Sequence, residues 1–384
     1  MVAEAEMRDA GRNDGVGGRL ESLDVFRGAT IAAMMLVNNP GTSDFVYPQL
    51  RHAEWHGWTF TDLVFPFFLW IVGVALTLSS AKRVARGESK SLLMLHALRR
   101  SVIIFALGLF LSGFPFFNLH TLRIPGVLQR IAVCYLVATI IFLNTRVRGQ
   151  IAWTASLLIA FWILMRFVPV PGYGAGVLEK EGNFAQYIDG LLLKGHMWAA
   201  TSTWDPEGIV STLPAIATTL FGVLTGHMLG ARWSSEEKAA WMFTLGNTLV
   251  AAGLVLGVWL PINKNLWTSS FAVLMAGMAL SAFAFSFWMV DVKGWGKWVR
   301  PLSIYGRNAI AVYVIAGILA RTLVFTRLST DGGGSMTLKE WVFRTFFAPL
   351  AAPINASLLY AICYVLLLYA VAWVIYRRGW LIRI

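Results

Sequence analysis

Residues 61–81 read TDLVFPFFLWIVGVALTLSSA, and this stretch decides the fold. It carries one charged residue, Asp62, near its start, and then runs without charge to Ala81. A helix of about 20 mostly apolar residues is long enough to cross the hydrocarbon core of a bilayer. The stretch therefore predicts a transmembrane helix.

Similar runs recur along the chain and predict ten membrane spans. They fall at 24–40, 61–81, 97–117, 125–143, 151–168, 209–230, 240–260, 268–290, 302–320 and 356–376. The 384 residues are 57% hydrophobic and 14% charged, whereas a soluble domain is about 45–50% apolar and about 25% charged. The sequence thus predicts an all-α polytopic membrane protein, a bundle of about ten transmembrane helices.

The net charge of +12 is distributed unevenly. Most of the 32 Lys and Arg residues fall in segments such as KRVARGESK (82–90), which lie on one side if the N-terminus is inside. Cytoplasmic loops attract such residues, so both termini are predicted to be cytoplasmic, and nucleic-acid binding is not needed to explain the charge. The outer segments include two long loops, 169–208 and 321–355, to which the sequence assigns no role.

Cysteine and histidine give little support for a metal site. Cys134 and Cys363 lie inside apolar runs and are expected to be core residues. His52 and His56 are four residues apart but lack convincing further ligands. An imidazole suits general-base work or carrying a group, and Asp62 is close enough in sequence to orient one. A pair of interfacial histidines in an aromatic belt remains the plain alternative.

Several charged or polar residues lie in or beside predicted spans, where they are costly and often functional. Asp24 and Arg27 open the first span, Arg130 lies inside the fourth, and Arg307 with Asn308 begins the ninth. Asp24 and Arg27 fit an interfacial cap and a snorkelling arginine as well as a site that meets an anionic substrate. Arg130, Arg307 and Asn308 each fit a site residue or a structural ion-pair member. The acidic DPEG turn at 205–208 also fits the start of a helix.

Six blocks of sequence resemble one known family in this order. They are RLESLDVFRGATIAAMMLVNNPG (19–41), HAEWHGWTFTDLVFPFFLWIVG (52–73), IPGVLQRIAVCYLVAT (124–139), DPEGIVSTLPAIATTLFGVLTGHML (205–229), INKNLWTSSFAVL (262–274) and PLSIYGRNAIAVYV (301–314). Together they resemble the heparan-α-glucosaminide N-acetyltransferase family and its bacterial relatives. The resemblance covers roughly residues 19 to 315, so residues 20–384 are interpreted as a single transmembrane acyltransferase domain after a disordered cytoplasmic tail at 1–19.

The resemblance implies a reaction across the membrane. Acetyl would pass from cytoplasmic acetyl-CoA, a co-substrate, to the amine of a glucosamine-type sugar on the outer, periplasmic side, without a metal. His52 matches the family's active-site histidine, acting as base or acetyl carrier, whereas His56 receives no role. Asn38 matches the asparagine that closes the first span, and Asp62 matches the acidic residue of the same block.

Two binding sets complete the expectation. The outer set, for the sugar, consists of Asp205, Glu207, Asn263, Lys264, Asn265, Trp267 and Arg130. The inner set, for acetyl-CoA, is predicted from charge and side alone and consists of Arg27, Arg307, Asn308, Arg99 and Arg100. A homodimer and a bacterial inner membrane are expected by analogy. Two other functions stay open: an O-acyltransferase of a cell-surface polysaccharide, and a transporter of sugars or muropeptides.

Overall fold

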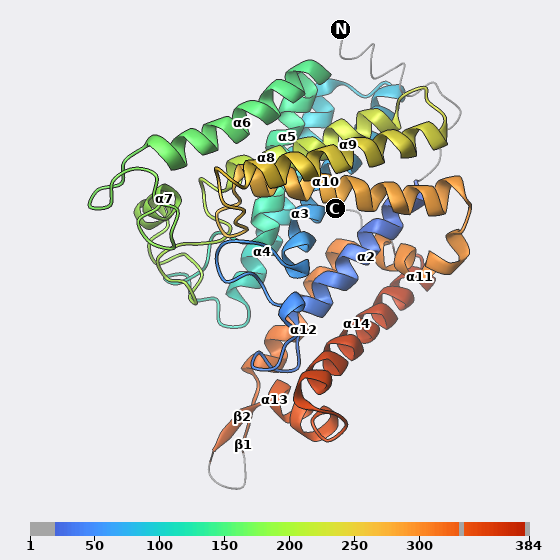
Figure 1. The fold of residues 1–384 in the computed structure, drawn as a ribbon. Helices are drawn as coiled ribbons and strands as arrows, with labels where there is room; N and C mark the ends of the chain where they lie inside the picture. Colours follow the sequence, from blue (N-terminus) through green and yellow to red (C-terminus); the bar gives the residue numbers. More distant parts are fainter. Residues whose placement is uncertain (1–19, 330–333, 381–384) are drawn as a thin grey trace.

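The computed structural model describes residues 20–329 and 334–380 and is built almost entirely of helices (Figure 1). The predicted tail at 1–19 lies outside the described residues. The helices are α2 (Glu21–Asn38), η1 (Pro48–Leu50), α3 (Phe60–Ala85), α4 (Lys90–Gly113), α5 (Val127–Asn144), α6 (Val147–Phe167), α7 (Phe184–Leu192), α8 (Thr212–Leu229), α9 (Ser235–Leu256), α10 (Ser269–Phe287), η2 (Trp288–Val292), α11 (Gly296–Arg307), α12 (Ala309–Phe325), α13 (Leu338–Val342), η3 (Phe343–Phe347) and α14 (Pro353–Arg377). Strands β1 (Arg327–Ser329) and β2 (Ser335–Thr337) form an antiparallel hairpin.

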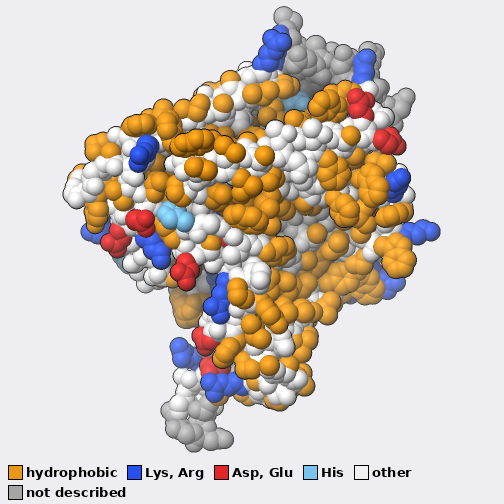
Figure 2. Space-filling view, in the orientation of Figure 1, with side chains coloured by type: hydrophobic (Ala, Val, Ile, Leu, Met, Phe, Trp, Pro, Cys, Tyr) orange, Lys and Arg blue, Asp and Glu red, His pale blue; other side chains and the backbone are white. Residues whose placement is uncertain are grey.

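The all-α polytopic class is confirmed, and every predicted span falls on a helix. Among the described residues, eight helices are long and apolar enough to cross a membrane, and α11 with α12 makes a ninth if that bent pair is one span. The one predicted span outside this count is the first, 24–40, which corresponds to α2; the 18 residues of α2 include Glu21, Asp24 and Arg27. Hydrophobic side chains cover most of the face seen in Figure 2, and charged ones gather toward its edges.

The bundle has inner and outer helices. The most hydrophobic stretches of α3, α5, α8 and α10 are 61–67% buried within the protein, whereas those of α4, α6 and α9 are only 22–28% buried. The second group thus surrounds the first and presents apolar side chains outward, as lipid-facing helices do. The inner helices pack around a core that includes Leu69 and Trp267.

Close approach of α3 and α8 depends on glycine. A Cβ added at Gly73 would lie 1.9 Å from the Thr219 carbonyl oxygen, and one at Gly222 would lie 1.9 Å from the Trp70 carbonyl oxygen. Backbone atoms cannot move aside as a side-chain tip can. Small residues at such crossings let membrane helices pack tightly, so these two glycines hold the centre of the bundle together.

The predicted span at 302–320 is wrong as a single continuous helix. It is divided into α11 and α12, whose axes differ by 69°. Asn308 lies at the break with φ −122° and ψ 37°, which is not helical. Asparagine accepts such backbone conformations because its short amide side chain competes with the helical hydrogen bonds.

One cysteine also differs from expectation. Cys134 is buried, as predicted, but Cys363 is exposed on α14. A helix at the edge of a bundle turns part of its apolar surface outward, so an apolar run in the sequence does not reveal which of its residues face the core. Both cysteines are free thiols.

Candidate functional site

A histidine–aspartate pair lies where the chain enters α3. The Nδ1–H of His52 donates to Asp62 Oδ1 at 2.6 Å. The His52 side chain is 49% exposed, whereas the Asp62 side chain is 1% exposed. A buried carboxylate thus orients an exposed imidazole, whose other nitrogen, Nε2, makes no hydrogen bond with another described residue.

The start of α3 holds Asp62 in place. Thr59 is the N-cap residue, and it forms a reciprocal capping box with Asp62. Asp62 Oδ2 accepts the backbone N–H groups of Ala53 and Thr59, each at 3.0 Å, and the Thr59 hydroxyl at 3.1 Å. One carboxylate therefore caps the helix, fixes the loop that carries His52 and orients the ring.

The second histidine belongs to a different set of contacts. His56 Nδ1 lies 3.4 Å from the Asn263 amide nitrogen, and its Nε2 lies 3.9 Å from Glu179. The Gly57 N–H donates to the Ile262 carbonyl at 2.7 Å. The loop before α3 is thus tied to the turn before α10, which brings two of the six sequence blocks together.

That turn, residues 263–268, is tightly constrained. Asn263 is buried and its side chain accepts the Leu266 N–H at 2.8 Å. Trp267 has φ +51°, a conformation that bulky residues rarely adopt and that often marks a functional site. Lys264 and Asn265 are half-buried on this turn. The positive charge of Lys264 acts on the carboxyls of both Asp62 and Glu207.

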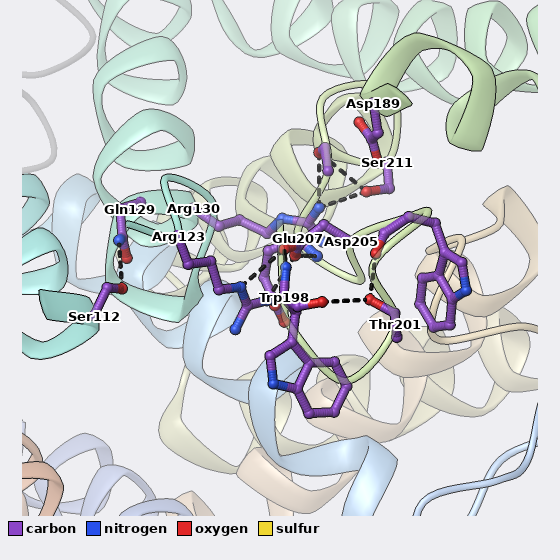
Figure 3. Close-up of polar contacts among 12 residues, drawn as sticks. Ser112, Arg123, Gln129, Arg130, Asp189, Trp198, Thr201, Asp205, Glu207 and Ser211 are labelled. Carbon is purple, nitrogen blue, oxygen red and sulfur yellow. Dashed lines mark hydrogen bonds and ion pairs between the residues drawn. The ribbon is translucent and has the colours of Figure 1, made fainter. Parts of the chain in front are cut away.

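A cluster of charged residues centres on Arg123, for which the sequence predicted no role (Figure 3). Its Nε and Nη2 bind Asp205 at 2.8 and 2.6 Å, and Nη2 also contacts Glu207 at 2.5 Å. Asp205 further accepts the N–H groups of Trp198 and Glu207, at 2.8 and 2.9 Å. The predicted residues Asp205 and Glu207 are therefore side by side, both bound to one arginine.

Burial and charge shift the titration of this cluster. Burial alone would lower the pKa of Arg123, but its hydrogen bond to Asp205 and the charge of Glu207 outweigh it. Burial alone would raise the pKa of Glu207, but the positive charges of Arg123 and Lys264 outweigh it. The Arg123 pKa is thus raised and the Glu207 pKa lowered, so both stay charged. Burial raises the pKa of the neighbouring Asp189 from about 3.8 to about 6, although the Ile209 N–H bound to its carboxylate opposes the change.

Arg130 lies deeper in the same region, on α5. Its Nη2 donates to the Gly208 carbonyl at 3.0 Å and to the Ser211 hydroxyl at 2.5 Å, and its guanidinium lies 5.2 Å from the centre of the Trp267 ring. Its Nε and Nη1 have no hydrogen-bond partner among the described residues. Arg130 therefore joins α5 to the turn before α8 and is covered by protein rather than open to a ligand.

A cavity extends from the opposite end of the bundle to the first turn of α5. It has a volume of about 390 Å³, and four arginines line it: Arg27, Arg83, Arg100 and Arg307. Asn308, one of the residues predicted to bind acetyl-CoA, also lines this cavity, and most of the other lining residues are apolar side chains of α2, α3, α5 and α12. The predicted Arg99 lies instead in an adjoining cavity of about 300 Å³, with His96 and Tyr135. We call the end of the bundle with Arg83, Arg99 and Arg307 the Arg307 end, and the end with the His52–Asp62 pair the His52 end.

Asn38 is the predicted residue that the structure leaves most separate. It is the last residue of α2, its side chain is exposed, and it makes no hydrogen bond with another described residue.

The sequence did not predict four residues of these two regions. Arg83, Tyr135 and Tyr313 line the cavity, and Arg123 binds the two carboxylates. Arg123 could have been predicted as a site residue, because it is a basic residue in an outer segment, whereas most Lys and Arg residues fall in the inner segments. Within residues 20–329 and 334–380, no group of three or more His, Cys, Asp or Glu side chains could hold a metal ion.

Fold and site together define a polytopic helical membrane protein with a histidine–aspartate pair at one end and an arginine-lined cavity at the other. Comparison with known proteins is more specific. Residues 19–259 match the family model described as "Heparan-alpha-glucosaminide N-acetyltransferase, catalytic". The chain therefore belongs to the heparan-α-glucosaminide N-acetyltransferase family, as the sequence blocks predicted.

Two curated relatives carry the same name, heparan-alpha-glucosaminide N-acetyltransferase. The protein from Homo sapiens is 32% identical over 353 residues, which cover 77% of this chain and 52% of the relative. The protein from Mus musculus is 31% identical over 353 residues, covering 77% and 53%. The chain thus spans about half the length of the curated relatives it matches.

Proposed function

We propose that this protein is a transmembrane N-acetyltransferase. Acetyl would pass from acetyl-CoA at the Arg307 end to the amine of a glucosamine-type sugar at the His52 end. The observation that carries the proposal is the exposed His52 bound to the buried Asp62, in a chain of this family. A neutral imidazole held by a buried carboxylate is suited to remove a proton from an attacking amine.

The charge distribution supports the direction of transfer. Several Lys and Arg residues line the cavities of the Arg307 end, including Arg83, Lys297 and Arg300. Under the positive-inside tendency that end faces the cytoplasm, where acetyl-CoA is made. The start of α2 and the end of α14 lie at the same end, because Glu21 and Tyr376 line one cavity with Arg307. His52 then faces the outside, where a sugar acceptor would be found. A bacterial inner membrane and a homodimer remain predictions.

The Arg307 end suits the donor chemically. The phosphates of coenzyme A are strong anionic acceptors, and guanidinium groups bind phosphate through directed, charge-assisted hydrogen bonds. Arg100 and Arg307 each have a buried Nε without a hydrogen-bond partner among the described residues. Apolar residues such as Phe68, Ile131 and Ile310 line the cavity beyond these arginines, and an apolar passage suits the uncharged pantetheine arm.

At the reacting end, the proposed chemistry is direct transfer. The acceptor first loses one proton to solvent if it arrives as an ammonium ion. The neutral amine then attacks the thioester carbonyl while His52 Nε2 takes a proton from its nitrogen, the carbon–sulfur bond breaks, and that proton passes to the departing thiolate. Asn38, exposed at the same end, is assigned the developing oxyanion, where one donor can contribute about 2.7–4 kcal/mol. In the alternative form, His52 first takes the acetyl group and then passes it on.

Purified protein incubated with labelled acetyl-CoA and a panel of amino sugars tests the proposal. We expect CoA release with an N-acetylated product. His52→Ala should lower the rate by about 10²–10⁴, the usual contribution of a positioned acid or base, and Asp62→Asn should lower it without raising KM for acetyl-CoA. His120→Ala is the matched control, because His120 is an exposed histidine of the 118–126 loop at the same end.

The outcomes separate the rival functions. Full activity in His52→Ala would contradict the assignment of His52. An O-acetylated product would favour the polysaccharide O-acyltransferase, and sugar uptake without consumption of acetyl-CoA would favour the transporter. An isolable acetylated protein with ping-pong kinetics would favour the acetyl-histidine form over direct transfer.

A further inference from the structure

The arginine-lined cavity and the charged cluster at the His52 end are neighbours. Val127 and Leu128, in the first turn of α5, line the cavity, and so does Tyr313 of α12. Arg123 precedes Val127 by four residues. The charges of Glu207 and Arg123 both act on the Tyr313 hydroxyl. Arg123 and Glu207 do not line the cavity themselves, but they lie on the side of it that Val127 and Tyr313 form.

This ion pair lies at the boundary with the outside. The Arg123 side chain is 24% exposed, that of Glu207 is 7% exposed and that of Asp205 is fully buried. The Arg123 guanidinium also lies 5.6 Å from the ring centre of Trp198. Arg123 is thus the most exposed member of the cluster, and Figure 3 shows it beside Trp198 and the two carboxylates.

The two carboxylates hold Arg123 unequally. Asp205 binds both Nε and Nη2 and is itself fixed by two backbone N–H groups. Glu207 receives only Nη2, which it shares with Asp205. Bidentate binding is the stronger and more specific arrangement. Glu207 can therefore leave Arg123 while Arg123 keeps its charge partner.

Glu207 also lies within reach of other positive charge. Lys264 and Arg130 act on its carboxylate, and Lys264 acts on Asp62 as well. Glu207 is thus an ionised, nearly buried carboxylate close to the residues that surround the histidine–aspartate pair. A protonated amine approaching His52 would find in Glu207 an anion that is held by a single contact.

We propose that Arg123 is a positioning residue that closes the cavity against water from the His52 end, and that a cationic acceptor opens it by replacing Arg123 at Glu207. The identity of the acceptor as an amino sugar rests on the proposed function. The barrier to water that Arg123 forms is argued from the ion pair and the cavity alone. Exclusion of water from a reactive thioester prevents its hydrolysis, so such a barrier would restrict cleavage of acetyl-CoA to occasions when an amine is bound.

Cysteine labelling tests the barrier without any catalysis. Cys134 and Cys363 are replaced by Ala, Tyr313→Cys is introduced, and a membrane-impermeant maleimide is applied to the His52 side of sealed vesicles. Phe116→Cys, at an exposed residue of that end, reports that the reagent has access. Arg123→Lys keeps a positive charge beside Asp205 but loses the forked contact. We expect it to speed labelling at position 313 by roughly tenfold, equivalent to about 1.4 kcal/mol in the opening equilibrium.

The acceptor part has a matched pair of probes. Glucosamine, which carries a protonated amine, should speed labelling in the chain with Arg123 and Glu207 intact, whereas N-acetylglucosamine, which has no such charge, should not. Glu207→Gln should abolish the response to glucosamine. Fast labelling that depends on neither Arg123 nor the sugar would overturn the proposal, and so would equal responses to the two sugars.

A second measurement links the barrier to the reaction. In the chain that retains Tyr313, Arg123→Lys should increase CoA release in the absence of any acceptor, because water then reaches the thioester. Unchanged CoA release from an active enzyme would contradict the barrier. If no variant consumes acetyl-CoA but labelling still follows Arg123 and glucosamine, the proposed N-acetyltransferase function fails while the barrier stands.

Discussion

At the scale of single residues, the site depends on carboxylates whose roles differ because their partners differ. Asp62 orients His52 and also caps α3. Asp205 is saturated by Arg123 and two backbone N–H groups, whereas Glu207 has one shared contact. Residue type alone does not distinguish these three roles, since each follows from which donors the fold brings to the carboxylate.

Asp189 gives a prediction for pH dependence. Its pKa is raised by burial to about 6, so between pH 4 and pH 6 the folded protein binds more protons than the unfolded chain. The free energy of unfolding must then fall as pH rises through this window. Asp189→Asn keeps an oxygen for the Ile209 N–H but cannot ionise. We expect its apparent Tm to exceed that of the unmodified protein by a margin that grows up to about pH 6 and then levels off.

Thermal unfolding in detergent, followed at several pH values, checks this expectation. Asp44→Asn serves as control, because Asp44 is exposed on the 39–59 loop. A margin for Asp189→Asn that is the same at pH 4 and pH 7 would contradict the effect of burial on Asp189.

At the scale of elements, the junction of α2 with α11 determines the shape of the Arg307 end. Gly306 lies where α11 ends and approaches the Asp24 backbone of α2, and Gly28 approaches Leu302 in the same way. Because α11 is held against α2, the chain must turn at Asn308 to enter α12. That turn brings Arg307 and Asn308 to the cavity lined by Arg27.

Gly28→Ala should separate these two helices. An added Cβ would lie 1.8 Å from the Leu302 carbonyl oxygen, and relief requires the backbone to move. Overpacking of this kind typically costs about 1–3 kcal/mol, so we expect a lower apparent Tm and weaker protection by acetyl-CoA. Gly190→Ala in α7 is the control, because its Cβ would meet nothing within 4 Å. Equal stability of the two variants would contradict the close contact.

At the scale of the whole molecule, two ends of one bundle are assigned to two substrates. This arrangement predicts that changes at one end alter KM for one substrate only. Arg100→Gln and Arg307→Gln should each raise KM for acetyl-CoA by about tenfold to hundredfold, since a hydrogen bond to a charged group contributes about 1.5–3 kcal/mol. KM for the amino sugar should stay the same.

Initial rates with each substrate varied in turn measure both constants. Arg86→Gln is the control, because Arg86 is an exposed arginine at the same end that does not line the 390 Å³ cavity. A rise in KM for the sugar, or an equal effect of Arg86→Gln, would show that the two ends do not act separately.

The sequence by itself determined the helical membrane fold, because crossing a bilayer requires long apolar runs that are visible residue by residue. It also supplied the family, through blocks that include His52 and Asp62, and that assignment is confirmed. Only the tertiary structure decided the bend at Asn308, the exposure of Cys363 and the joining of Arg123 to Glu207. Hydropathy is a local property of the chain. These three features depend on contacts between segments that are far apart in the sequence, so a local pattern of residues does not reveal them.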